Sequence, residues 1–247
     1  MARDALDTAT LDLLSPALLR IDTTKQPSAP ILQRIEINWL HLIKRRRVVL
    51  ETCEGMPAYL LLPEVHHLLD AAKHANNHLL LTTLWHTGAR ISECLALTKS
   101  SFTLTDEWGS HVILTTLKQR GRPAETSREK NRKDKKRVVP ITDPVFLDEL
   151  QRYFATHPLK KNERIFPITR QAADKRLRQL TSSMAKTLPI DVSCHTLRHS
   201  FAVNAVLHGE PLTVIRDWLG HADLSSTEIY TNVLTTETNH LMRYMNF

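Results

Sequence analysis

Residues 195–199 read His-Thr-Leu-Arg-His, and this short stretch is the starting point for both the fold and the function of the chain. His195 and Arg198 are three positions apart, so a helix places them on one face, one turn from each other. The surrounding pattern predicts such a helix over 196–208. Many helices carry a pair of this kind, so the stretch becomes informative only together with its neighbours.

A second segment, residues 86–93, reads His-Thr-Gly-Ala-Arg-Ile-Ser-Glu. Gly88 is expected to end a helix over 77–87, because glycine adopts the left-handed conformation of a helix end without strain. Arg90 and Glu93 follow, one helical turn apart. Taken alone, this segment also fits a surface arginine that simply follows a helix end.

A third segment, residues 219–221, reads Leu-Gly-His, and Tyr230 follows nine residues after His221. Considered alone, His221 fits a histidine in a turn. Composition alone favours packing of Tyr230 in the core. The order and spacing of the three segments are much more specific than any one of them.

Hydrophobic periodicity over the rest of the chain predicts a mainly α-helical fold with a small antiparallel β-sheet. Pro63 suits the first turn of a helix. The helices are predicted at 31–50, 64–75, 77–87, 91–97, 143–156, 170–186, 196–208, 211–218, 225–231 and 236–245, and the strands at 101–105, 111–117 and 137–141.

The positive charge of the chain is concentrated in one segment. The 247 residues include 33 Lys and Arg against 26 Asp and Glu, a net charge of +7, and residues 118–137 alone carry ten basic and three acidic residues. This segment lies between two predicted strands, so we expect a long hairpin loop that contacts a polyanion. A solvated basic loop is the alternative. The candidate contact residues are Arg120, Arg122, Arg128, Lys130, Arg132, Lys133, Lys135 and Lys136.

A smaller basic cluster, Lys44, Arg45, Arg46 and Arg47, ends the predicted helix over 31–50. It fits a phosphate contact and equally a solvated helix end favoured by the helix dipole.

The composition excludes several classes of protein. No stretch approaches the length of a membrane span, and the N-terminus lacks the apolar core of a signal peptide, so we expect a cytoplasmic protein that does not enter a membrane. The three cysteines, Cys53, Cys94 and Cys194, form no C-x-x-C pair, which argues against zinc and against a disulfide framework.

Together the three segments resemble the tyrosine recombinase (phage integrase) family. The family's T-G-x-R-x-x-E motif looks like residues 87–93, and its H-x-L-R-H box matches 195–199. Its L-G-H box, with a tyrosine nine residues on, matches 219–230. The resemblance extends over about residues 57–247 and is closest to short members such as plasmid resolvases and fimbrial invertases.

This resemblance implies a fold, that of the integrase catalytic domain, and a set of roles. Tyr230 would attack a DNA phosphodiester and form a 3′-phosphotyrosine link. Arg90 and Arg198 would clamp the phosphate oxygens, which suits the planar, permanently charged guanidinium. His195 would assist removal of the tyrosine proton, and His221 would donate a hydrogen bond to the phosphate.

Further roles follow from the same resemblance. Glu93 and His199 would orient these residues without contacting the phosphate themselves. Lys118 would protonate the 5′-oxygen leaving group from the hairpin. The other lysines that remain candidates for that role are Lys130, Lys133, Lys135 and Lys136.

The implied chemistry needs no metal, ATP or other cofactor, because cationic side chains supply the positive field. The implied partners are double-stranded DNA and further copies of the chain, as a tetramer on paired sites, with accessory DNA-bending proteins possible. Integration and excision, inversion and multimer resolution all remain open as biological roles. The competing functions are a non-catalytic DNA-binding regulator on the same scaffold and an enzyme similar to type IB topoisomerases.

The expected organisation has three parts: a short helical segment at 1–55, a catalytic domain at 56–232 and a tail helix at 233–247. The first part is shorter than the DNA-clamping domain of the family, so that domain is reduced or the chain is a fragment. The tail docks either on its own domain or on a neighbouring protomer.

Overall fold

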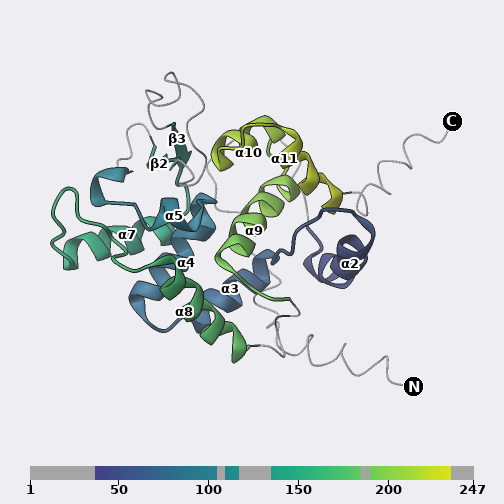
Figure 1. Cartoon of the computed structure of the whole chain (residues 1–247), viewed down its shortest axis with the longest axis horizontal. Coiled ribbons are helices and arrows are strands. Elements are labelled where there is room, and N and C mark those ends of the chain that lie inside the picture. The colour runs from purple at the N-terminus through teal and green to yellow at the C-terminus, as the bar shows by residue number, and fades with distance from the viewer. Residues whose placement is uncertain (1–36, 105–108, 117–134, 185–187, 189, 235–247) are drawn as a thin grey trace, which may run out of the picture.

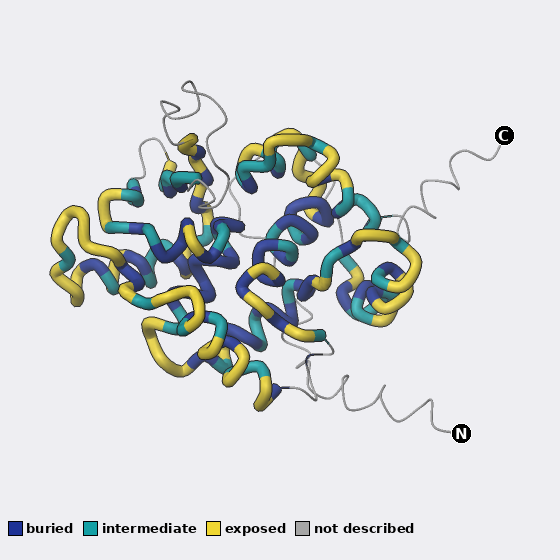
Figure 2. The backbone as a smooth tube through the Cα atoms, viewed as in Figure 1, coloured by how far each residue is buried: buried dark blue, intermediate teal, exposed yellow. Residues whose placement is uncertain are grey.

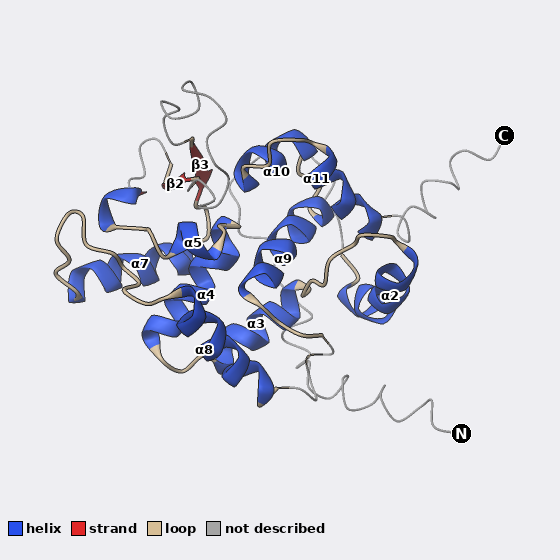
Figure 3. Cartoon of the chain, in the orientation of Figure 1, coloured by secondary structure: helices blue, strands red, loops and turns tan. Residues whose placement is uncertain are grey.

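The structure is a computed structural model that describes residues 37–104, 109–116, 135–184, 188 and 190–234. Helices dominate this part of the chain, and the strands form one small sheet (Figures 1 and 3). The predicted fold class, mainly α with a small antiparallel sheet, is confirmed. Among the described residues, no helix is both long enough and apolar enough to cross a membrane.

Most helices occur within a few residues of the predicted positions, but the helix predicted over 31–50 begins only at Trp39, because the Asn38 side chain caps it by accepting the backbone N–H of His41. The helices are α2 (Trp39–Thr52), α3 (Leu62–Ala71), α4 (Ala75–Thr87), α5 (Ile91–Cys94), α7 (Pro144–Thr156), α8 (Arg170–Ser182), α9 (Cys194–Leu207), α10 (Leu212–Leu219) and α11 (Ser225–Glu228), with 3₁₀ turns η1 (Lys99–Ser101) and η2 (Ile229–Val233). The predicted tail helix at 236–245 lies outside the described residues.

Local chemistry fixes several of these helix ends. Pro63 lies in the first turn of α3, as predicted. Gly88 ends α4 with φ 58°, in the left-handed conformation. The Ser193 side chain accepts the backbone N–H of Thr196, so α9 begins two residues before the predicted start.

The sheet has the order β1 (Phe102–Thr103), β2 (His111–Thr115), β3 (Lys136–Pro140), and both pairs are antiparallel. Along β3, Arg137 and Val139 are buried, whereas Lys136 and Val138 are exposed. The alternation follows from the two-residue repeat of a strand. It directs the Arg137 side chain into the protein.

Helix α9 runs through the middle of the molecule, and two apolar clusters lie on either side of it (Figures 1 and 2). The larger cluster joins α3, α4, α5, the sheet, α7 and α8, and receives Leu197 from α9. The smaller one joins α2, α10 and η2, and receives Val203 and Val206. Burial on both faces therefore holds α9 and its polar residues in a fixed position.

The basic cluster on α2 divides into buried and exposed residues. Arg46 is 3% exposed and forms a two-pronged ion pair with Glu64, in which Nη2 lies 2.8 Å from Oε1. The prediction that Arg46 contacts DNA is therefore wrong, because the carboxylate of Glu64 already neutralises the charge of this buried guanidinium. Lys44 and Arg47 are exposed, and Arg45 is partly buried.

Candidate active site

One buried arginine joins the three segments picked out from the sequence. Arg198, on α9, is 3% exposed. Its Nη1 donates to the Gly88 carbonyl at 2.7 Å, and its Nη2 donates to the Leu219 carbonyl at 2.7 Å. The side chain thus connects α9 with the turn after α4 and the end of α10. Burial lowers the pKa of Arg198, but an arginine keeps its charge at neutral pH.

Close packing explains the glycine at position 88. A Cβ atom there would lie 2.5 Å from the Phe201 ring, and the positive φ also disfavours other residues. The glycine therefore allows the segment that carries Arg90 to approach α9.

Arg90 and Glu93 meet at the start of α5. The backbone N–H of Arg90 donates to Glu93 Oε2 at 2.9 Å, and Arg90 Nη1 lies 3.1 Å from Oε1. The Arg90 side chain is 33% exposed, whereas that of Glu93 is 1% exposed. Glu93 thus holds the guanidinium from inside, while part of the guanidinium faces solvent.

A second arginine binds the same carboxylate. Arg137 Nη2 lies 2.6 Å from Glu93 Oε2, and Nη1 lies 3.1 Å from Oε1. Burial by itself would raise the pKa of Glu93, but Arg137 and then Arg90 outweigh it and hold the pKa below its usual value. Arg137 was not predicted as a site residue, because in the sequence it is one of ten basic residues in the segment 118–137. The sequence did hold one clue. Arg137 and Val139 are two positions apart on a predicted strand, so their side chains should point to the same face of the sheet.

Two histidines border the arginines. His195 lies at the exposed start of α9, and His221 follows Gly220, which ends α10 with φ 65°. The Nδ1 atom of His221 is hydrogen-bonded to the Thr227 hydroxyl at 2.9 Å. Burial, followed by the charge of Arg198, lowers the pKa of both histidines, that of His221 to about 4. Both rings are therefore neutral at neutral pH.

Tyr230 lies inside the protein, in η2. It is 2% exposed, and its hydroxyl is hydrogen-bonded to His199 Nδ1 at 2.8 Å. Burial, then His195 and Arg198, lowers the pKa of His199 to about 4, so its ring is neutral and can accept a hydrogen bond from the phenol. Burial raises the pKa of Tyr230, while the charges of Arg198 and Arg90 oppose the rise.

Only two of the candidate hairpin residues fall in the described part. Lys135 and Lys136 are exposed and line a pocket of about 340 Å³ together with Gly220 and His221. The base of the hairpin is thus next to a predicted catalytic histidine. The remaining candidates lie outside the described residues: Lys118, Arg120, Arg122, Arg128, Lys130, Arg132 and Lys133.

A second pocket, of about 430 Å³, borders His195. It is lined by Arg170 and Arg178 of α8 and by Asp174 between them. The charge of Arg170 also lowers the pKa of His195. Both charges therefore lie beside His195 on α8, where Arg170 is paired with Asp174 at 3.7 Å.

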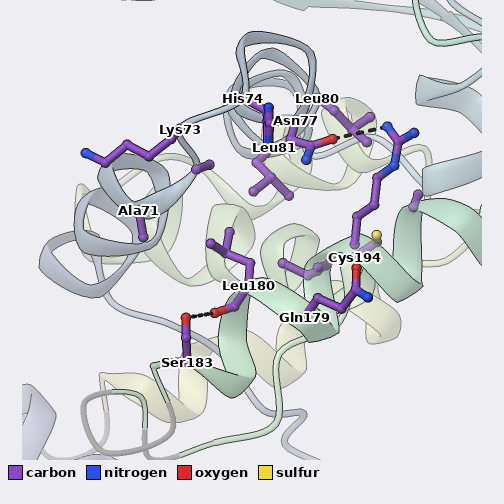
Figure 4. Close-up of a pocket in the computed structure, with 14 residues that line it drawn as sticks. Ala71, Lys73, His74, Asn77, Leu80, Leu81, Gln179, Leu180, Ser183 and Cys194 are labelled. Atoms are coloured by element: carbon purple, nitrogen blue, oxygen red, sulfur yellow. Dashed lines mark hydrogen bonds between the residues drawn. The ribbon is translucent and has the colours of Figure 1, made fainter.

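A third cavity, of about 310 Å³, lies between the α3–α4 turn and α8 (Figure 4). Leu80, Leu81 and Leu180 line it, and Arg176 donates to Asn77 at 3.2 Å across its rim. None of the predicted site residues is among its lining residues. The cavity is thus separate from the cluster around Arg198.

The chain matches the phage integrase family over residues 59–237. It belongs to this family. A resolvase of Escherichia coli is 35% identical over 200 residues, covering 74% of this chain and 76% of the relative. Tyrosine recombinase XerD of Halalkalibacterium halodurans is 31% identical, covering 73% of this chain and 59% of the relative.

Solved structures show the same fold. The crystal structure of the XerH site-specific recombinase bound to its difH substrate superposes with a TM-score of 0.56 at 23% identity, over 74% of this chain and 52% of that one. Together the family match and the relatives make the protein a tyrosine recombinase, an enzyme of site-specific DNA recombination.

Proposed function

We propose that Tyr230 attacks a phosphodiester of duplex DNA, forms a 3′-phosphotyrosine link and releases a 5′-hydroxyl. One observation carries this proposal: the charges of Arg90 and Arg198 converge on the tyrosine and on two histidines from different segments. Both arginines oppose the rise in the pKa of Tyr230, and both lower the pKa of His195 and His221. A phosphate bound there would lie in the field of both guanidinium groups, and the phenol would reach it after leaving its buried position.

Arg90 and Arg198 would clamp the non-bridging oxygens of the scissile phosphate. Negative charge increases on those oxygens in the pentacoordinate transition state, so fixed positive groups stabilise that state most. Arg198 is already held by two backbone carbonyls, and Arg90 by Glu93. Both guanidinium groups are therefore already held in place before DNA binds, so the reaction does not have to pay the entropy of ordering them.

The histidines would move the proton and bind the phosphate. A neutral imidazole donates at one ring nitrogen and accepts at the other. We propose that His195 receives the Tyr230 proton once the tyrosine has left its buried position, and that His221 donates to a phosphate oxygen. His199, the partner of the buried hydroxyl, would support the site without touching DNA.

A hairpin lysine would protonate the 5′-oxygen as it leaves. Lys118 is the proposed residue, and Lys135 and Lys136 are the alternatives whose position next to His221 is described. A substrate with sulfur in place of that bridging oxygen distinguishes them, because a thiolate leaves without a proton. The alanine variant of the true general acid should cleave normal DNA slowly and the sulfur substrate at the wild-type rate. A Lys118→Ala variant with equal defects on both substrates would exclude Lys118.

The reaction would need no metal or other cofactor, since the arginines and the lysine supply positive charge at the phosphate. The phosphotyrosine keeps the energy of the phosphodiester until a second 5′-hydroxyl attacks it. The exposed Lys44 and Arg47, the partly buried Arg45 and the hairpin residues are proposed to contact the DNA backbone.

Assembly and biological role are proposed by analogy. Four copies would act on paired DNA sites in the cytoplasm, with accessory DNA-bending proteins in some systems. The three parts at 1–55, 56–232 and 233–247 stay the proposed organisation.

The test compares plasmids with one and two candidate sites. We expect recombinant circles only from the two-site plasmid, in EDTA and without ATP. Relaxation of the one-site plasmid by a monomer would support a topoisomerase-like enzyme instead. Site-specific binding with no strand cleavage, even on nicked DNA, would support a non-catalytic regulator.

A further inference from the structure

Arg137 joins the base of the hairpin to two segments of the candidate active site. The side chain projects inward from β3, and the residue is 8% exposed. Its Nε donates to the Trp218 carbonyl at 2.7 Å, and its Nη1 donates to the Thr116 hydroxyl at 3.2 Å. Together with the two bonds to Glu93, the guanidinium contacts the end of α10, the end of β2 and α5.

The two bonds to Glu93 matter because this carboxylate also binds Arg90. Glu93 is buried, and a buried carboxylate requires charged or hydrogen-bonding partners. Arg137 engages both of its oxygens, whereas the Arg90 guanidinium touches only Oε1. Without Arg137, the buried charge would attract Arg90 as its sole cationic partner. A two-pronged Arg90–Glu93 pair would then take donors away from the phosphate.

Arg137 also packs against the residue that precedes His221. A Cβ atom at Gly220 would lie 3.0 Å from both Cδ and Nη1 of Arg137. The guanidinium therefore lies directly on the backbone of the turn that orients the histidine.

We propose that Arg137 is a positioning residue for recombination, which keeps the Arg90 guanidinium available to the scissile phosphate and fixes the His221 turn against the hairpin base. This inference rests on the proposed function, in which Arg90 clamps the phosphate. Arg137 itself does not touch DNA in this account. It acts through Glu93 and Gly220.

A second buried pair, Arg46–Glu64, provides a matched control. It has the same two-pronged geometry but joins α2 to α3. Single-turnover cleavage of a nicked substrate is measured at saturating DNA for Arg137→Met and Arg46→Met, at a temperature where circular dichroism shows both folded. We expect Arg137→Met to lower the rate about 10- to 100-fold, since small errors in placing catalytic groups have effects of that size. Arg46→Met should stay within a few-fold of wild type, and both should bind DNA with wild-type affinity.

A double variant distinguishes a positioning role of Arg137 from a purely structural one. Adding Glu93→Gln to Arg137→Met removes the negative charge that would trap Arg90, so part of the lost cleavage rate should return. If Arg137→Met does not fold, Arg137→Lys is compared with Arg46→Lys, because lysine keeps the charge but loses the fork.

The outcomes distinguish the inference from the function on which it rests. An Arg137 variant that cleaves as fast as its Arg46 counterpart, or a double variant slower than Arg137→Met, would overturn the positioning role alone. A wild-type protein that binds its site but never cleaves it would overturn the proposed function, and the inference with it.

Discussion

The hydroxyl of Tyr230 lies 2.8 Å from Nδ1 of His199, inside a protein in which the tyrosine is only 2% exposed. A DNA phosphate cannot reach a hydroxyl in that position. The described conformation is therefore a resting state, in which the proposed nucleophile is beside the arginine pair but covered. DNA binding must move η2, the side chain or both before cleavage.

Removing the hydrogen-bond acceptor should loosen this resting state. His199→Leu leaves the buried phenol unpaired, which costs about 1–3 kcal/mol and raises the open population about tenfold. We expect nitration of Tyr230 in the DNA-free protein to speed up accordingly, as measured by peptide mass spectrometry. Tyr153, which lies elsewhere, serves as the internal reference. Equal nitration rates at Tyr230 in variant and wild type would show that His199 does not hold the tyrosine.

The two neighbours Arg46 and Arg47 should behave in opposite ways. Arg46→Met leaves Glu64 buried without its partner, so we expect a loss of about 3–5 kcal/mol in urea unfolding with DNA affinity unchanged. Arg47→Ala breaks only an exposed pair with Glu51, and should leave stability unaltered while weakening DNA binding. A weaker salt dependence of DNA binding in Arg46→Met would contradict the burial of its charge.

The basic hairpin should carry much of the electrostatic affinity. Replacing 119–134 with a short Gly-Ser linker removes six basic and three acidic residues. We expect weaker binding and a flatter plot of log affinity against log salt, by about 0.9 for each phosphate that the protein no longer neutralises. Gel-shift titrations from low to moderate salt measure both. An unchanged slope would make the segment a solvated loop.

Stability should fall in mild acid. Burial, the main cause, lowers the pKa of His86 to about 4, from 6.5 in an unfolded chain. Between these values the unfolded chain binds a proton that the folded protein does not, so stability is full above pH 6.5 and declines as the pH falls toward 4. His86 stacks on Phe146 with centroids 4.7 Å apart, so His86→Phe preserves the stacking. Its melting temperature should fall less than that of wild type from pH 7 to 4.5, and an equal fall would refute the assignment.

Much of the fold was predictable because local signals are strong at its helix ends. Pro63 and Gly88 mark a helix start and a helix end through backbone geometry alone, and both predictions were confirmed. The three motif segments also meet in space, through Arg198.

The errors concern arginines whose partners are distant in sequence. Arg46 belongs to a basic run, and only folding brings Glu64 to it. Arg137 is likewise hidden in a basic run, 44 positions from Glu93. Charge counts treat every arginine alike, whereas the structure shows that Arg46 and Arg137 are paired with buried carboxylates and that Arg198 is held by neutral carbonyls. The only local clue was the alternation of side chains along a strand, which places Arg137 on the same face as Val139, and this clue applied only to Arg137.

The most direct test of the account is covalent trapping on a nicked duplex that carries the recombination site, with EDTA present. Wild type and Tyr153→Phe, a control for loss of a tyrosine hydroxyl elsewhere, should each give a protein–DNA adduct that survives denaturation. Tyr230→Phe should give none, and mass spectrometry of the wild-type adduct should place the 3′-phosphate on Tyr230. An adduct formed by Tyr230→Phe, or a phosphate found on another residue, would contradict the central claim.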